Sequence, residues 1–143
     1  MHETPDIPAA LSEPHPLYDP NAERWERTYA MWTHLGSMIA WLLAIASTGI
    51  GFWIPIAFAA IMWSVRKSES PFVDDHGREA LNFQISLVLM GILAVVLGVL
   101  TCVGWIVTVP AVFVLGMIGA IMGATAASKG QYFRYPATFR FFN

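Results

Sequence analysis

The absence of charge along most of the chain constrains its fold more than any other feature. Residues 80–100 are twenty-one consecutive residues without a charged side chain, directly after the charged stretch 66–79. Apolar residues make up 56% of the chain and charged residues 13%, against about 25% in ordinary soluble domains. A soluble domain of this composition would lack the polar side chains to cover its surface. The sequence therefore predicts a protein embedded in a lipid bilayer.

Four apolar runs indicate how many helices this protein has: residues 28–47, 50–65, 81–101 and 104–127. A spanning helix needs roughly 17–25 residues to cross ~30 Å of hydrocarbon. We therefore expect an all-α fold, an integral membrane four-helix bundle over residues 21–128. The run 50–65 is short for a span, so a re-entrant hairpin formed with the first run is the alternative.

The charged residues predict how the helices thread the membrane. With four spans, the N-terminal tail, the 66–80 connection and the C-terminus lie on one side. All ten acidic residues and all eight basic residues belong to these segments. Because Lys and Arg accumulate on the cytoplasmic side, we expect both termini to face the cytoplasm from a bacterial inner membrane. The basic residues are Arg24, Arg27, Arg66, Lys67, Arg78, Lys129, Arg134 and Arg140.

The two ends of the chain differ from the helices. Residues 1–20 hold five of the nine prolines, which predicts a disordered proline-rich tail, and Asp19 followed by Pro20 predicts a helix start. Residues 129–143 alternate aromatic and basic side chains, which predicts a segment that lies along the lipid headgroups. The candidate interfacial residues are Tyr132, Arg134, Tyr135 and Arg140.

Small residues indicate how the helices contact one another. Lipid removes the hydrophobic drive between spans, so close van der Waals packing must hold them together. Gly119 and Gly123 in the fourth run have the small-xxx-small spacing. Packing within one four-helix bundle is the preferred interpretation, and a homodimer seam is the alternative.

The charged stretch before the third run carries the candidate functional residues. Asp75, Glu79, Asn82 and Ser86 recur at helical spacing and so share a face, and unpaired polar atoms are costly away from water. A solvated helix start is the blander interpretation, and a polar entrance or partner site is the functional one. The candidate residues are Asp75, His76, Arg78, Glu79, Asn82, Gln84 and His34.

His34 lies inside the first apolar run. Ionisable residues at membrane depth are functional-site hypotheses, but a hydrogen bond to Asn82, to Gln84 or to a carbonyl of a neighbouring helix is the favoured role. A metal site made by His34, His76 and Glu79 has little support, because only two of these residues are close in sequence.

The sequence contains no P-loop and no GxSxG, HExxH or CxxC motif. Cys102 is the single cysteine and matches no metal-ligand spacing. A net charge of −2 provides no basic surface for nucleic acid. We therefore expect no enzyme activity, no cofactor, no metal and no nucleic-acid partner.

Three segments resemble a known family: "ERTYAMWTHLGSMIAW" from Glu26, "SPFVDDHGREALNFQISL" from Ser70 and "GQYFRYPATFRF" from Gly130. Their order and spacing are similar to those of bacterial membrane proteins of domain-of-unknown-function family 4870. That family is distantly similar to the small four-helix subunit of the chloroplast inner-envelope protein translocon. The resemblance covers residues 23–142 and implies a small helical inner-membrane protein with, through the plastid relative, a translocon-like role.

The sequence and the resemblance together predict a non-enzymatic membrane assembly or translocation-type component. Its expected partners are the lipid bilayer and either further copies of itself or another membrane protein. The alternative is a small-solute or ion transporter or channel, formed by an oligomer, with a polar entrance at the start of the third helix.

Overall fold

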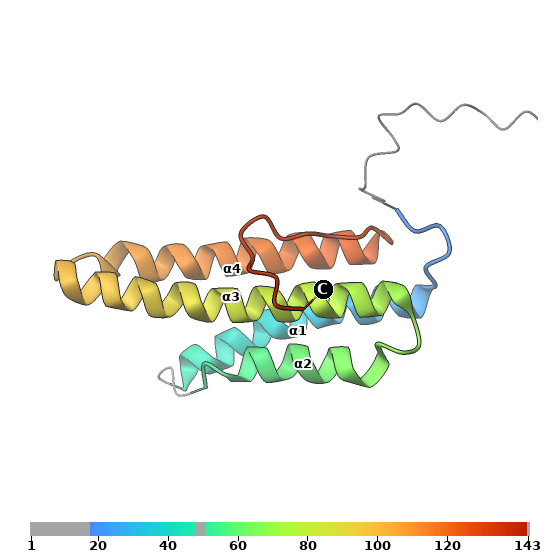
Figure 1. Cartoon of the computed structure of the whole chain (residues 1–143), viewed down its shortest axis with the longest axis horizontal. Coiled ribbons are helices and arrows are strands. Elements are labelled where there is room, and N and C mark those ends of the chain that lie inside the picture. The colour runs from blue at the N-terminus through green and yellow to red at the C-terminus, as the bar shows by residue number, and fades with distance from the viewer. Residues whose placement is uncertain (1–17, 48–50, 143) are drawn as a thin grey trace, which may run out of the picture.

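The computed structural model describes residues 18–47 and 51–142, and within them the fold is all-α (Figure 1). Most of the proline-rich tail lies outside the described residues. The structure confirms four helices at the four apolar runs. They are α1 (Arg24–Ala46), α2 (Ile54–Arg66), α3 (Pro71–Thr101) and α4 (Trp105–Ser128).

The predicted start of the first helix at Asp19 and Pro20 is wrong. Helix α1 begins after Glu23, where a capping box replaces the expected aspartate cap. The Glu26 carboxylate accepts a hydrogen bond from the Glu23 backbone N–H at 2.5 Å, which satisfies a donor that the first turn leaves unpaired. Residues 20 and 21 form a turn before the helix.

Helix α3 begins at Pro71, with Ser70 as its N-cap residue. The Ser70 hydroxyl accepts a hydrogen bond from the Val73 backbone N–H at 3.2 Å, and Pro71 occupies the first turn, where its missing N–H costs nothing. Asp74 and Asp75 therefore lie inside the helix. At 31 residues, α3 is about 46 Å long at ~1.5 Å per residue.

Three of the helices are long and apolar enough to cross a membrane: α1, α3 and α4. Helix α2 has 13 residues and is about 20 Å long, short of the ~30 Å hydrocarbon core. Figure 1 shows that the hairpin of α3 and α4 extends further than the pair α1 and α2 at the end away from the C-terminus. Helix α4 begins before Pro110 and continues through it.

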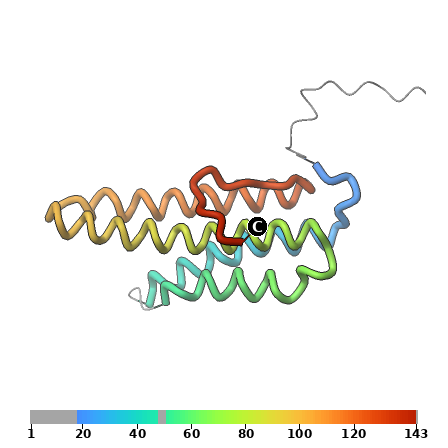
Figure 2. Tube along the Cα trace, in the orientation of Figure 1, coloured from blue at the N-terminus to red at the C-terminus, as the bar shows by residue number. Residues whose placement is uncertain are grey.

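The other end of the bundle gathers the polar groups. The start of α1, the connection between α2 and α3, and the end of α4 all lie there (Figure 1). Residues 129–142, here called the C-terminal segment, leave α4 at this end. Figure 2 shows them in red, returning over α4 and ending against α3. The fold thus brings the three charged parts of the chain together.

Small residues let the helices approach one another, as the sequence predicted for packing within one bundle. A Cβ atom at Gly119 would lie 2.5 Å from Cζ of Phe83, and one at Gly123 would lie 2.8 Å from the Tyr135 hydroxyl oxygen. Both glycines therefore face side chains of the same molecule. The alternative of a homodimer seam at this motif is not what the structure shows.

Alanine substitutions at two glycines should change stability in opposite directions. The Phe83 ring beside Gly119 stacks on Tyr135 with centroids 3.7 Å apart, so it cannot yield to a new methyl group. We expect Gly119→Ala to lower the free energy of unfolding by about 1–3 kcal/mol. Gly91→Ala is the matched control, because its Cβ would meet nothing within 4 Å, and it should gain up to ~1 kcal/mol of helix propensity. Denaturant titration in micelles measures both, and equal effects would contradict this packing.

Candidate functional site

One face of α3 holds the end of the C-terminal segment through side-chain hydrogen bonds to its backbone. Asn82 Nδ2 donates to the Phe142 carbonyl at 2.9 Å, and Asn82 Oδ1 accepts from the N–H groups of Phe141 and Phe142, both at 3.0 Å. Four residues further along, Ser86 Oγ accepts from the Phe139 N–H at 2.9 Å. The side chains of Asn82 and Ser86 thus provide hydrogen-bond partners for backbone groups that no neighbouring strand satisfies.

The same face carries two carboxylates that bind the arginines of the C-terminal segment. Asp75 and Arg134 form a two-pronged ion pair, with N–O distances of 2.5 and 2.6 Å. Glu79, one turn along, receives Arg140 Nε at 3.1 Å and Arg134 Nε at 3.4 Å on the same oxygen, Oε1. The hydrogen bonds to Asp75 raise the pKa of Arg134 further. Asp75, Glu79, Asn82 and Ser86 therefore form one docking face, as their spacing predicted.

The exposures of the paired charges are unequal. The Glu79 side chain is 5% exposed, whereas those of Arg134 and Arg140 are 42% and 46% exposed. The buried carboxylate depends on these two guanidinium groups, since an unpaired buried charge is strongly destabilising. The arginines, in contrast, are partly exposed.

A buried chain of hydrogen bonds connects α1, α3 and the C-terminal segment. The Tyr135 hydroxyl lies 2.7 Å from His34 Nδ1, His34 Nε2 lies 3.0 Å from His76 Nδ1, and His76 Nε2 lies 3.0 Å from the Gln131 carbonyl oxygen. Neither histidine side chain reaches solvent. The expected hydrogen bond from His34 to Asn82, to Gln84 or to a carbonyl of a neighbouring helix is therefore wrong, because His34 pairs with His76 and Tyr135.

The carbonyl at the end of this chain sets the direction of every bond in it. A carbonyl oxygen only accepts, so His76 Nε2 carries the proton and its Nδ1 accepts from His34 Nε2–H. His34 Nδ1 then accepts from the Tyr135 hydroxyl, whose pKa burial raises well above its usual value. Both histidines are neutral and use both ring nitrogens. Every ring nitrogen of the two histidines is therefore used in this series of hydrogen bonds, and none is left to bind a ligand.

Two predicted site residues lie away from the docking face. Gln84 Oε1 accepts from Trp41 Nε1 at 2.6 Å, which joins α3 to α1 deeper in the bundle. Arg78 pairs with Asp74 at 3.0 Å within α3. The remaining candidates, His34, His76, Asp75, Glu79 and Asn82, meet around the C-terminal segment, as do Arg134, Tyr135 and Arg140.

Several partners in this site were not among the residues singled out from the sequence. The Gln131 carbonyl gives no sequence signal, since any residue provides a backbone carbonyl. Asp19 accepts a hydrogen bond from the Tyr132 hydroxyl at 3.2 Å, and this contact joins two segments that are far apart in the chain.

Tyr132 should titrate at unusually high pH. Burial, the hydrogen bond to Asp19 and nearby carboxylates raise the pKa of Tyr132 to about 12, against about 10 in an unfolded chain. The protonated hydroxyl is thus favoured in the folded state. Its stabilisation is complete below pH ~10 and is lost as the pH rises towards ~12. Ultraviolet titration of the phenolate, taken as the difference between the protein and Tyr132→Phe, should place the midpoint near the higher value.

The Asp19 contribution to this titration has its own control. Asp19→Asn removes the negative charge and should move the Tyr132 midpoint downwards. A Tyr132 midpoint close to that of a free tyrosine in the unchanged protein would contradict the packing of Tyr132 against Asp19.

The arrangement can bind and hold a peptide segment, but it offers no chemistry that needs an open nucleophile or ligand set. Across residues 18–47 and 51–142, no group of three or more His, Cys, Asp or Glu residues could hold a metal ion. The two histidines that sequence reasoning considered for a metal bond to each other instead.

A family model matches residues 25–142, and its description is the magnetosome magnetite crystal formation protein family. Comparison with curated proteins and with solved structures gives no significant match. The resemblance to domain-of-unknown-function family 4870 is therefore wrong, and so is the translocon-like role taken from its plastid relative. The three quoted segments meet in one packed cluster, through the pairs His34–His76 and Asp75–Arg134. They describe how this architecture packs, and that alone does not separate one family from another.

Proposed function

The chain belongs to the magnetosome magnetite crystal formation protein family, and from this premise we propose that it is a non-enzymatic component of the magnetosome membrane. It is a small multi-pass membrane protein, with three helices that are long and apolar enough to span. The family is described by crystal formation and not by a reaction. We propose that the protein acts by assembling with a partner at its charged end.

The observation that carries this proposal is the occupation of the α3 docking face by the chain itself. Asp75, Glu79 and Asn82 are each bonded to the C-terminal segment. A solute path would need polar groups that are free to replace the solute's water shell. A rigid, closed polar end instead supports a surface that a protein partner recognises.

We further propose that this end faces the cytoplasm, as the distribution of Lys and Arg indicates. The bundle is long enough for this placement, since α3 exceeds a ~30 Å hydrocarbon core by about 16 Å. The excess corresponds to its charged first turns. The far end, without charged residues, would then face the inside of the vesicle. An effect on crystal growth would therefore act through assembly and not through carboxylates placed on the mineral.

A transporter formed by an oligomer is the second candidate, and one observation favours it. Within the described residues, Glu79 Oε2 is buried without a hydrogen-bond partner. Buried acids of this kind occur on ion and proton paths through membrane proteins. The alternative predicts that release of the C-terminal segment opens a path past Glu79.

One pair of experiments separates the two functions. In a magnetite-forming bacterium, the double variant Glu79→Gln, Asn82→Ala should change crystal size when cells with equal amounts of the protein in the magnetosome membrane are compared. Arg66→Gln is the matched control, because it removes an exposed charge at the same end without touching the docking face. In proteoliposomes, the unchanged protein should give no flux of Fe²⁺ or protons. A flux through the unchanged protein that Glu79→Gln alone abolishes would replace assembly with transport.

A further inference from the structure

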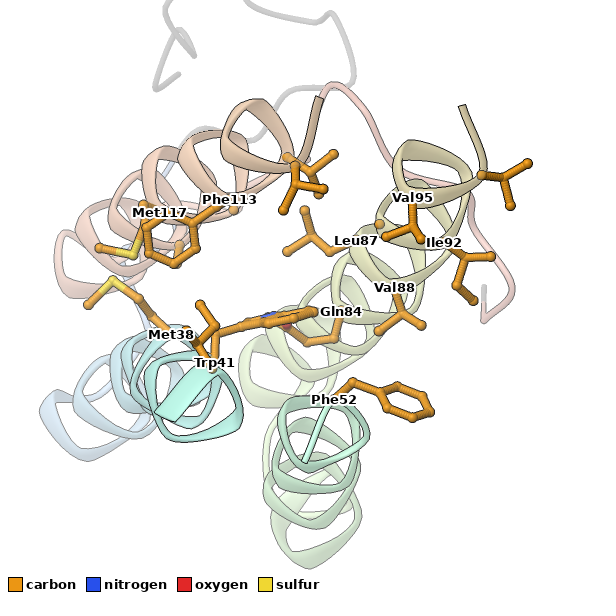
Figure 3. Close-up of a pocket in the computed structure, with 17 residues that line it drawn as sticks. Met38, Trp41, Phe52, Gln84, Leu87, Val88, Ile92, Val95, Phe113 and Met117 are labelled. Atoms are coloured by element: carbon orange, nitrogen blue, oxygen red, sulfur yellow. The ribbon is translucent and has the colours of Figure 1, made fainter. Parts of the chain in front are cut away.

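We propose that a cavity between α1, α3 and α4 binds one acyl chain of a membrane phospholipid. The cavity has a volume of about 470 Å³ and lies away from the docking face, in the uncharged half of the bundle. Figure 3 shows its walls, with Met38 and Trp41 on α1, Leu87 and Val88 on α3, and Phe113 and Met117 on α4. The site is independent of the proposed function.

The side chains that line the cavity offer few hydrogen-bonding groups to water. Its polar side chains are Trp41 and Gln84, and these are hydrogen-bonded to each other at 2.6 Å. A buried water usually makes about three hydrogen bonds, so water is poorly suited to this space. An empty space of this size is also unfavourable, because protein interiors pack at crystal density. An apolar occupant satisfies both conditions.

The mouth of the cavity opens towards the lipid-facing surface. Four lining residues at the rim are also half exposed: Ile45, Phe52, Ile92 and Val95, at 52%, 52%, 56% and 51%. The rim and the surface around it are apolar, and none of the described residues that line the cavity is charged. A hydrocarbon chain can therefore enter directly from the bilayer, whereas a headgroup would find no partner inside.

The size of the cavity favours an acyl chain over a helix of another protein. The three helices that enclose the cavity contact one another, and a helix of another protein, about 10–12 Å across with its side chains, would have to separate them to enter. The cavity wall also has free space beside Gly91, where an added Cβ atom would meet nothing within 4 Å. A flexible chain of methylene groups follows such a space without rearrangement of the helices.

Photocrosslinking with a phosphatidylcholine that carries a diazirine in the middle of one acyl chain tests this proposal. After purification in detergent, native mass spectrometry should show one retained phospholipid per protein. Irradiation should label cavity residues such as Met38 and Met117. Gly91→Phe places a ring in the cavity and should reduce retention and cavity labelling at least about tenfold. Val95→Phe, at the rim, should act in the same direction if Gly91→Phe fails to fold.

Ile118→Phe is the matched control, because Ile118 is 52% exposed and does not line the cavity. It should leave retention and labelling unchanged. Unchanged cavity labelling in folded Gly91→Phe would overturn the proposal. So would retention of no phospholipid by the unchanged protein, or crosslinks at Met38 and Met117 to a second protein chain.

Discussion

Replacing Asn82 with alanine should detach the end of the C-terminal segment from α3. Asn82 is 1% exposed and makes three hydrogen bonds to the backbone of Phe141 and Phe142. Alanine removes all three part-buried hydrogen bonds, each worth about 0.5–1.5 kcal/mol, so we expect a loss of about 2–4 kcal/mol in the free energy of unfolding. Trypsin should then cut after Arg134 and Arg140 in the variant well before it cuts the unchanged protein.

Asn82→Asp is the matched comparison for this experiment. Its side chain keeps the acceptor oxygens for the two backbone N–H groups but loses the donor to the Phe142 carbonyl. It also adds a charge near Glu79. We expect a stability between those of Asn82→Ala and the unchanged protein. Cleavage of Asn82→Ala at the rate of the unchanged protein would show that other contacts hold the segment.

The second large effect is expected at His34. His34→Phe keeps an aromatic ring of similar size but leaves the Tyr135 hydroxyl and His76 Nδ1 without partners. Both residues are at most 2% exposed, and each unpaired buried group costs about 1–3 kcal/mol. The free energy of unfolding should therefore fall by about 2–5 kcal/mol, measured by denaturant titration in lipid nanodiscs.

A double-substitution cycle tests whether the loss comes from the hydrogen-bond chain. In a Tyr135→Phe background the hydroxyl is already gone, so His34→Phe should cost clearly less than it does alone. His34→Gln should retain part of the stability, because its amide can still donate to His76. Additive effects of His34→Phe and Tyr135→Phe would mean that the two side chains contribute independently.

The helices and their shared polar face could be predicted from the sequence because both are local patterns. An apolar run of suitable length specifies a membrane helix, and the spacing of Asp75, Glu79 and Asn82 specifies a face. Helix α2 shows the limit of this argument, since it has 13 residues and begins only at Ile54, whereas the apolar run 50–65 begins four residues earlier. At the start of α1, the capping box of Glu23 and Glu26 prevailed over the Asp19-Pro20 signal.

The sequence could not predict in the same way that the C-terminal segment binds the polar face of α3. The bonds from the C-terminal segment join residues that are 53 to 61 positions apart. Such contacts depend on how the helices pack and leave no periodic pattern. Sequence reasoning could say that Asn82 needed a partner, because an unpaired amide away from water is costly. The partners turned out to be backbone groups, which every residue provides.

The family could not be assigned correctly from the three quoted segments alone. The three segments that suggested domain-of-unknown-function family 4870 include the residues that hold the packed cluster together, among them His34, His76 and Arg134. These residues determine how the helices and the C-terminal segment pack. Agreement at those positions therefore indicates the fold, and fold alone does not specify function.

Hydrogen exchange of three backbone amides tests the central claim most directly. In lipid nanodiscs, the N–H groups of Phe139, Phe141 and Phe142 should exchange much more slowly than those of an unstructured peptide, because Ser86 and Asn82 accept their hydrogen bonds. In Asn82→Ala, the protection of Phe141 and Phe142 should disappear. If all three amides of the unchanged protein exchange at the unstructured rate, the polar face of α3 is open, and the account of a closed charged end is wrong.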